Sequence, residues 1–282
     1  MMTTSVTMQI NSIDDAVNHV LSAISGDIVL AIPLGIGKPN PLVNALYRRI
    51  KANASRRLKI ITALSLEKPV GKSELEQHFL APLVERVFED YPDLDYVKDL
   101  RAGELRLHIE VQEFFMKTGD YLDNELAQQN YISTNYTFVA RDMAVQGVNV
   151  LMQAIAARPG DGNRYSLSSN PDLTIEVVKN ARDNDTPLLV VGVVNDRMPY
   201  MPNTAEVAAD FFDVIVTDHA ASHALFAPPN GKISTADYAI GLHASSLVAD
   251  GGTLQIGIGA LGDAIAQALI VRERNGDRKS VV

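Results

Sequence analysis

Short apolar runs rich in β-branched residues alternate in this chain with longer segments of helical spacing. The apolar runs are DIVLAI (27–32), LKIITAL (58–64), PLLVVGVV (187–194), DVIVT (213–217) and TLQIGI (253–258), and the helical segments are 14–24, 41–54 and 173–184. Such alternation is typical of βαβ units, whose parallel strands are buried on both faces. The sequence therefore predicts an α/β fold of three layers, in which helices cover both faces of an open, largely parallel sheet.

The rest of the sequence divides the chain into two parts. Residues 68–130 are more charged and more helical, and we expect them to elaborate the α/β core. The strongest break is APPNG (227–231). We therefore predict one domain over residues 1–230 and the beginning of a second over 231–282. Because only 24 residues follow Ile258, the second domain is expected to be truncated.

The composition excludes several classes of site. The 282 residues include no cysteine, which excludes disulfides, cysteine nucleophiles and thiolate metal sites and suits a reducing cytoplasm. The net charge of −9 and the scattered basic residues disfavour binding to nucleic acid. We recognise neither a signal peptide nor an apolar run long enough to span a membrane. We expect a cytoplasmic protein that binds neither membrane nor nucleic acid.

Two glycine turns follow predicted strands and precede helical segments: Gly35 and Gly37 in GIGKPN, and Gly257 and Gly259 in GIGALG. The second turn matches G-x-G-x-x-G, which in a dinucleotide site requires an acidic residue about 20 positions on, after a further strand. That region reads RERNGDRKSVV, so a NAD-dependent dehydrogenase is a less favoured alternative. Turns that need glycine for backbone geometry alone are the other alternative. Because the same strand, glycine turn and helix occur twice, we favour a protein of two halves with similar architecture. Each half would offer backbone amides to an anionic or thioester ligand.

Three segments resemble the acetyl-CoA hydrolase/transferase family (CoA-transferase family I), which includes 4-hydroxybutyrate and acetate CoA-transferases. They are IPLGIGKPNPLVNAL (32–46), STNYTFVARDMAVQGVNV (133–150) and VADGGTLQIGIGALGDAIAQAL (248–269), the last carrying the signature D-G-x-T-L-Q-x-G-I-G. The resemblance implies two tandem domains of the CoA-transferase (NagB/RpiA-like) fold, with the active site between them. It also implies a role in acetate metabolism, either as a hydrolase or as a transferase.

The resemblance assigns roles to both turns. Gln255, Gly257, Ile258 and Gly259 would lie beside the acyl-CoA, where amides can stabilise the charge that develops on a thioester oxygen. Gly35 and Gly37 would face the acyl or carboxylate side. The acyl-CoA and the carboxylate are substrates, and no cofactor or metal is implied.

In the family a glutamate of the second domain attacks the thioester, and a glutamyl-CoA thioester follows. It lies in a stretch of the type G-I-H-[ST]-E-M, which none of the 282 residues matches. We therefore expect this chain alone to be inactive and to act as a homo-oligomer or with the missing half. The alternative is a noncatalytic or partner-dependent CoA-binding subunit.

Other polar residues are weaker candidates. Lys38 is expected either to meet an anion in the cleft or to be a solvated surface lysine. Asn135 and Arg141 are expected either to face the cleft or to serve helix capping and surface pairing. Glu110 and Glu113 are expected on an exposed helix, although they could act as bases if they lined a cleft.

The histidines and serines are expected to have structural roles. His219 and His223 have the i, i+4 spacing of a metal-binding helix, but no third ligand is evident. His243 is expected to be a half-buried packing residue. The run Ser166–Ser169 lacks the G-x-S-x-G pattern, which disfavours a serine hydrolase.

Overall fold

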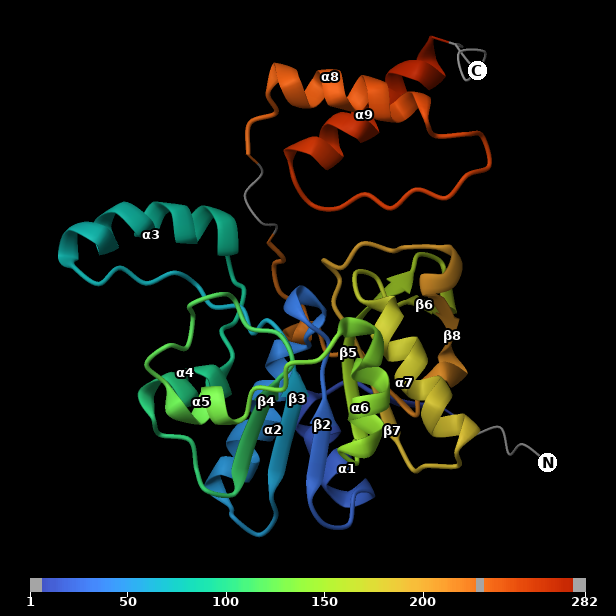
Figure 1. Cartoon of the computed structure of the whole chain (residues 1–282). Coiled ribbons are helices and arrows are strands. Elements are labelled where there is room, and N and C mark those ends of the chain that lie inside the picture. The colour runs from blue at the N-terminus through green and yellow to red at the C-terminus, as the bar shows by residue number, and fades with distance from the viewer. Residues whose placement is uncertain (1–6, 227–230, 276–282) are drawn as a thin grey trace. The chain divides into compact units, whose positions relative to one another are not determined.

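The computed structural model describes residues 7–226 and 231–275, which fall into two compact units, Met1–Phe226 and Ala227–Val282 (Figure 1). The predicted domain boundary between residues 230 and 231 involves a residue outside the described ranges. Each unit has its own internal contacts. The first unit carries the sheet, and the described part of the second contains helices and loops.

A sheet in the order β1-β9-β7-β5-β2-β3-β4 forms the centre of the first unit. All six pairings along this order are parallel. Two short strands lie off this order: β6 pairs antiparallel with the carboxyl end of β5, and β8 pairs antiparallel with β6. The strands are β1 (Met8–Ile10), β2 (Ile28–Ala31), β3 (Leu58–Thr62), β4 (Ile109–Glu113), β5 (Val150–Arg158), β6 (Asp161–Ser166), β7 (Leu189–Val194), β8 (Glu206–Ala208) and β9 (Val214–Val216).

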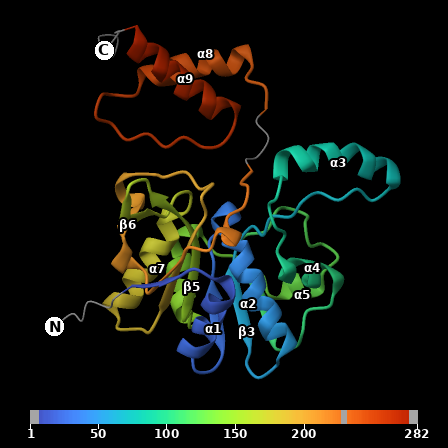
Figure 2. The same ribbon diagram turned by 180° about the vertical axis from the view of Figure 1, so that it is seen from behind.

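Helices cover both faces of this sheet, so the three predicted layers and the α/β class are confirmed. Helices α6 (Val139–Val145) and α7 (Pro171–Asp183) lie on one face, as Figure 1 shows. Helices α1 (Ile13–Ala23) and α2 (Asn40–Ala52) lie on the other, seen from behind in Figure 2. Each face therefore has its own apolar core, as expected of a parallel sheet.

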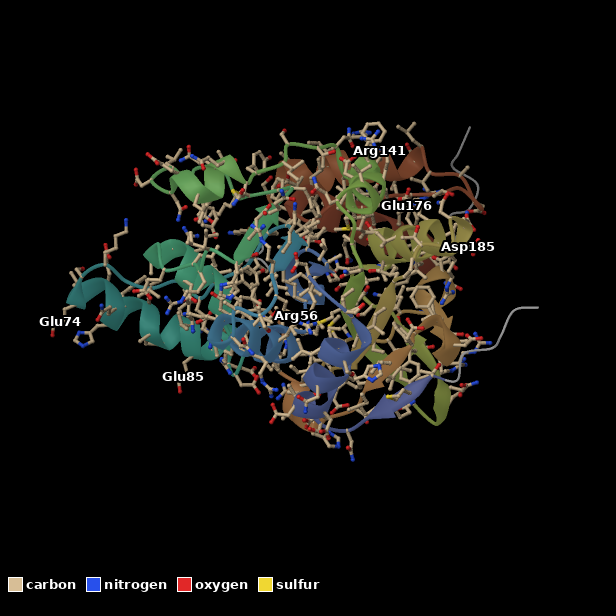
Figure 3. The ribbon with its side chains drawn as sticks, turned by 90° about the horizontal axis from the view of Figure 1, so that it is seen from below. Arg56, Glu74, Glu85, Arg141, Glu176 and Asp185 are labelled. Atoms are coloured by element: carbon tan, nitrogen blue, oxygen red, sulfur yellow. The ribbon has the colours of Figure 1, made fainter. Side chains whose placement is uncertain are left out.

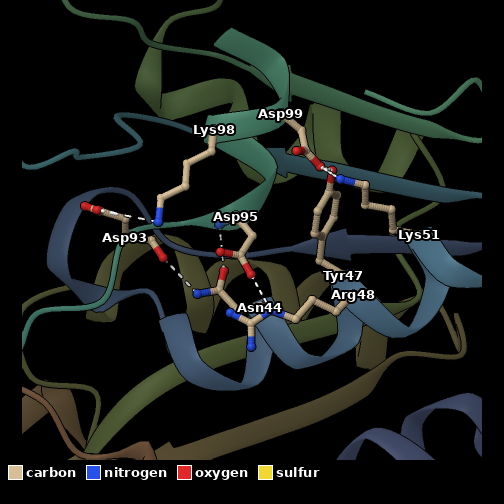
Figure 4. A network of polar contacts seen from close by, with 8 residues as sticks. All are labelled: Asn44, Tyr47, Arg48, Lys51, Asp93, Asp95, Lys98 and Asp99. Carbon is tan, nitrogen blue, oxygen red and sulfur yellow. Dashed lines mark hydrogen bonds and ion pairs between the residues drawn. The ribbon is translucent and has the colours of Figure 1, made fainter. Parts of the chain in front are cut away.

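Polar contacts fasten α4 (Asp95–Ala102) to α2 (Figure 4). Arg48 Nε lies 2.5 Å from a carboxylate oxygen of Asp95. Asp99 accepts hydrogen bonds from Tyr47 and from Lys51. Burial alone would raise the pKa of Asp99, but the bonds from Lys51 and Tyr47 lower it below its ordinary value. These contacts fix α4, part of the helical elaboration, to α2, which covers one face of the sheet.

The segment 68–130 contains three helices, α3 (Glu74–Phe88), α4 and α5 (Glu125–Gln129), which agrees with the expected elaboration. It also contains β4, an edge strand of the sheet that the sequence analysis did not predict. Helix α3 begins with a capping box at Ser73 and Glu76 and buries only Phe88. Its acidic residues Glu74 and Glu85 point outward in Figure 3.

The second unit contains α8 (Thr235–Ser246) and α9 (Ala260–Arg274). The helices approach closely at Gly241, where an added Cβ would lie 2.7 Å from the Ala264 carbonyl oxygen. The strand predicted over residues 253–258 is wrong, because this segment is a loop. A strand needs a partner for its backbone groups, and within residues 231–275 no strand is present to supply one.

Candidate functional site

The Gly35–Gly37 turn lies where β2 leaves the sheet and α2 begins. It forms a short 3₁₀ helix, η1 (Gly35–Gly37), which follows the carboxyl end of β2. Ligands of open α/β sheets bind at the carboxyl ends of the strands, so the topology places this turn at the edge where a site is expected. Helix α2 follows with Pro41 in its first turn, where a missing N–H costs little.

Both glycines of this turn have a steric reason to be glycine. Gly35 has φ of +58°, a left-handed conformation that side chains other than glycine rarely adopt. A Cβ added at Gly37 would lie 2.2 Å from Oδ1 of Asn170, the residue that precedes α7. The turn therefore fits closely against the loop that leads into α7.

Lys38 immediately follows the turn, and the prediction of a solvated surface lysine is wrong. The residue is 1% exposed. Its ammonium Nζ donates to the carbonyl oxygen of Ala63 at 2.6 Å and to that of Leu64 at 3.1 Å. These carbonyls belong to the segment that leaves β3. Lys38 thus joins the glycine turn after β2 to the exit of the neighbouring strand.

Glu113 ends β4 and is 2% exposed, so the predicted exposed helix over Glu110 and Glu113 is wrong. Its Oε1 has no hydrogen-bond partner among the described residues. The alternation of buried and half-buried positions over IEVQE is that of a strand, and the period of two in the sequence would have identified it. The strand places this carboxylate at the same edge as Lys38.

The two buried groups influence each other's protonation. Burial lowers the pKa of Lys38 to about 7, and the nearby Glu113 carboxylate opposes that shift. Burial raises the pKa of Glu113, and Lys38 opposes that shift in turn. Without the partner's opposite charge each group would be still harder to ionise in this position.

Hydroxyl groups lie near Glu113. Ser65 Oγ and Tyr96 Oη are 2.8 Å apart, and both residues are buried. Burial and the charge of Glu113 raise the pKa values of Tyr96 and Tyr121, so both phenols stay neutral at physiological pH. The carboxyl edge of β2, β3 and β4 therefore holds an amide turn, a buried amine, a buried carboxylate and neutral hydroxyls. Such groups can orient a carbonyl or carboxylate and hold a proton.

Asn135 and Arg141 make contacts of the local kind. Asn135 is exposed and caps η2 (Tyr136–Phe138) by accepting from the Thr137 backbone N–H. Arg141 lies on the surface of α6 (Figure 3), where it pairs with Asp142 at 2.7 Å and stacks over Phe138. Helix capping and surface pairing describe these contacts, and a cleft-facing role for either residue stays a prediction.

The second turn opens α9. Gly259 precedes the helix with φ of +143°. A Cβ added at Gly262 would lie 2.3 Å from the Gly257 carbonyl oxygen, so this position needs glycine. At Gly257 nothing lies within 4 Å of an added Cβ, and Ile258 is 83% exposed. Gln255 is also exposed. The turn thus presents an open surface beside a helix N-terminus, where backbone N–H groups favour negative charge.

The structure corrects the histidine predictions. His219 is exposed and contacts Asp196, whereas His223 is buried outside any helix, so the two do not share a helix face. His243 is exposed and not half-buried. Within residues 7–226 and 231–275 no group of histidine, aspartate and glutamate side chains could hold a metal ion. The same ranges contain no helix of the length and apolarity that crossing a membrane requires.

Ser166 is buried and bonded to the backbone, since its hydroxyl donates to the Met201 carbonyl oxygen at 2.7 Å. Ser168 likewise donates to the Pro199 carbonyl oxygen. These contacts give both hydroxyls structural roles.

Comparison with known proteins gives one local sequence match and a broader likeness of fold. No protein-family model matches the sequence. A segment of 77 residues is 39% identical to 4-hydroxybutyrate coenzyme A transferase from Clostridium kluyveri and covers 27% of this chain and 17% of that protein.

Among solved structures, RipA from Yersinia pestis has a TM-score of 0.58 at 16% identity, over 92% of this chain and 53% of its own. A 4-hydroxybutyrate CoA-transferase from Porphyromonas gingivalis has a TM-score of 0.50 at 17% identity, over 92% and 51%. The putative alfa subunit of citrate lyase from Streptococcus mutans, solved with citrate, has a TM-score of 0.52 at 15% identity, over 98% and 51%.

The chain therefore spans about half the length of these solved proteins. At these identities the structural likeness shows the fold alone, which is that of CoA-transferases and of the citrate lyase subunit. The local sequence match is the independent finding. Together, the match and the fold relate this chain to CoA-transferase family I.

Proposed function

We propose that this chain is part of an enzyme that moves coenzyme A between an acyl-CoA thioester and a carboxylate. The observation that carries the proposal is the 39% identity over 77 residues to a 4-hydroxybutyrate coenzyme A transferase. The signature at Asp250–Gly259 and the glycine turn at the carboxyl edge of β2 support it.

In this proposal each glycine turn supplies backbone amides. Attack on a thioester places negative charge on its carbonyl oxygen, and amides fixed in advance stabilise that charge. The open turn at Gly257–Gly259 is assigned to the acyl-CoA, since a thioester can approach its backbone without meeting a side chain at Gly257. The turn at Gly35–Gly37 is assigned to the acyl or carboxylate group.

By family resemblance the nucleophile is a glutamate. Its carboxylate attacks the thioester carbonyl and forms an acyl anhydride as the CoA thiolate leaves. The thiolate then attacks the glutamyl carbonyl, which gives the glutamyl-CoA thioester and releases the carboxylate. No segment of the 282 residues matches the family's glutamate stretch, so we do not assign the nucleophile to a residue of this sequence.

A partner-dependent CoA-binding subunit is the second candidate. The likeness of fold to a putative citrate lyase subunit favours it, because that protein is one subunit of an assembly. Under this candidate the chain binds acyl-CoA and a separate polypeptide supplies the nucleophile. Hydrolysis, with water in place of the carboxylate, would use the same turns.

Calorimetric titration of the purified chain with acetyl-CoA tests the proposal. Gly257→Ala is the sharpest variant, because its Cβ meets no atom within 4 Å and φ is not left-handed, so the fold should tolerate it. The added methyl would occupy the surface assigned to the thioester. We expect acetyl-CoA binding to weaken by up to about tenfold, the size of one lost hydrogen bond to a neutral carbonyl group.

Gly162→Ala in β6 is the matched control, since its Cβ also meets nothing within 4 Å, and it should bind acetyl-CoA like the wild type. NADH should give no saturable heat with any of the three proteins. A wild-type chain that does not bind acetyl-CoA, or that binds NADH instead, would contradict the proposal.

Activity measurements separate the two candidates. The chain is incubated with acetyl-CoA and acetate, and borohydride is used to detect a glutamyl thioester. Turnover by the chain alone would show that the nucleophile lies within these 282 residues. Binding without turnover, followed by activity when a second polypeptide is added, would favour the subunit.

A further inference from the structure

Backbone carbonyl groups already occupy most of the Lys38 ammonium, which leaves at most one N–H for any other acceptor. The side chain is 1% exposed, and two of its three N–H donors are directed at the carbonyl oxygens of Ala63 and Leu64. Both carbonyls follow β3, whereas Lys38 itself follows the turn after β2. The side chain is therefore a bridge between two loops at the carboxyl edge of the sheet.

One end of this bridge holds an unfavourable backbone conformation. Leu64 has φ of +47°, which residues other than glycine adopt at a cost. Two hydrogen bonds fix it: its N–H donates to the Phe115 carbonyl oxygen at 2.9 Å, and its own carbonyl accepts from Lys38. Lys38 thus bonds to the residue where the β3 exit is most strained.

The buried charges of Lys38 and Glu113 lower the stability of the folded chain. Burying an amine and a carboxylate together generally costs more than packing apolar residues of the same volume. Glu113 is 2% exposed; hydrogen bonds from Ser65 favour its ionised form, but its Oε1 has no partner among the described residues, so the charge is only partly compensated by hydrogen bonds. What the arrangement gains is a fixed position for the loops that Lys38 joins.

The turn is supported on its other side by packing. Gly37 lies against the Asn170 side chain, as the 2.2 Å distance from an added Cβ shows. Asn170 is held in turn, since its carbonyl oxygen accepts from Gln153 Nε2 at 3.0 Å and its Oδ1 accepts from Ser169 at 3.0 Å. The Gly35–Gly37 turn therefore sits between Asn170 and the bridge that Lys38 makes to the β3 exit.

We propose that Lys38 is a positioning residue that fixes the Gly35–Gly37 turn against the exit of β3, with Glu113 as its buried counter-charge. Lys38 does not touch the ligand and acts through the amides of the turn. What those amides bind rests on the proposed function, whereas the positioning role does not.

The test compares Lys38→Met with the double variant Lys38→Met/Glu113→Gln. Lys38→Met alone leaves the Glu113 carboxylate buried without its counter-charge, so it is expected to fold poorly. The double variant removes both charges with little change in volume and should fold. Lys179→Met is the control, because Lys179 is an exposed lysine on α7 paired with Asp183.

The readouts are the ¹⁵N-labelled glycine amide signals and hydrogen exchange at the Leu64 amide. In the double variant we expect the Gly35 and Gly37 signals to move and exchange at Leu64 to accelerate at least about tenfold, as expected when one net hydrogen bond to a charged group is lost. The signals of Gly160 and Gly162, distant in sequence, should stay in place. The control should resemble the wild type throughout.

Two results would overturn the proposal. One is a folded double variant whose Gly35 and Gly37 signals and Leu64 exchange equal those of the wild type. The other is a double variant that fails to fold, since the proposal assigns the charged pair a net cost in stability. If the wild-type chain does not bind acetyl-CoA, the proposed function fails, but these readouts still decide the role of Lys38.

Discussion

Replacing Gly37 by alanine tests how closely the first turn is packed. The new Cβ would lie 2.2 Å from Asn170 Oδ1 and 2.8 Å from its Cγ, far inside ordinary contact. Asn170 cannot move freely, because it is buried and bonded to Gln153 and Ser169. Overpacking of this kind costs about 1–3 kcal/mol. Gly37 does not have a left-handed φ, so the reduced entropy of the unfolded chain returns about 0.4–1 kcal/mol.

We therefore expect Gly37→Ala to lower the free energy of unfolding by about 1–2 kcal/mol, measured by urea denaturation. Gly162→Ala, which meets no atom, should stay within about 0.5 kcal/mol of the wild type. Adding Asn170→Ala removes the clashing Oδ1 and Cγ and leaves only Cβ, at 3.1 Å. The double variant should recover most of the loss. A Gly37→Ala protein as stable as the wild type, or strictly additive effects of the two substitutions, would refute the packing argument.

Three further predictions concern buried groups and the second turn. The pKa of Lys38 is lowered to about 7, so between pH 8 and 9.5 the unfolded chain binds a proton that the folded chain does not. Wild-type stability relative to the double variant Lys38→Met/Glu113→Gln should therefore rise there by about 1.4 kcal/mol per pH unit, and parallel pH profiles in urea would contradict this. Burial lowers the pKa of His223, so below about pH 6.5 the unfolded chain binds a proton more readily than the folded chain, and the wild type should lose stability. His223→Phe should lose less stability over the same pH range. Equal losses in the two proteins would show that His223 is solvated. Gly262→Ala directs a methyl group at the Gly257 carbonyl oxygen, so it should increase hydrogen exchange at the start of α9. Gly257→Ala, whose Cβ meets no atom, should leave that exchange unchanged. Equal exchange in the two variants would contradict the turn geometry.

Runs of continuous Val, Ile and Leu identified four of the five strands that lie inside the sheet, whereas the central strand β5 (Val150–Arg158), which reads VLMQAIAAR, was not predicted. β2, β3, β7 and β9 were predicted for this reason, and all four are flanked on both sides. β4 was missed because Glu110, Gln112 and Glu113 interrupt its apolar residues, which an edge strand tolerates better than a central one. The run at 253–258 has the composition of a strand but no partner within residues 231–275, and composition alone cannot supply one.

The glycine turns were predictable in position but not in surroundings. A strand, two glycines and a helical pattern are local features, and η1 and the start of α9 occur where they indicated. The burial of Lys38 depends on carbonyls about 25 residues later in the sequence, and that of Glu113 on the pairing of β4 with β3. Lys38 and Glu113 were named from the sequence as separate candidates, but contacts between residues so far apart in the sequence leave no local pattern, so the two were not brought together as a buried pair.

Addition of acetyl-CoA to the ¹⁵N-glycine-labelled chain tests the central claim most directly, because the sequence has glycines in both turns and at distant sites. The account predicts saturable shifts of the Gly257 and Gly259 signals, with Gly35 and Gly37 responding to the acyl or carboxylate group, while Gly160 and Gly162 stay unchanged. Shifts confined to glycines outside the two turns, or no shift at saturating acetyl-CoA, would contradict the assignment of these turns to an acyl-CoA site.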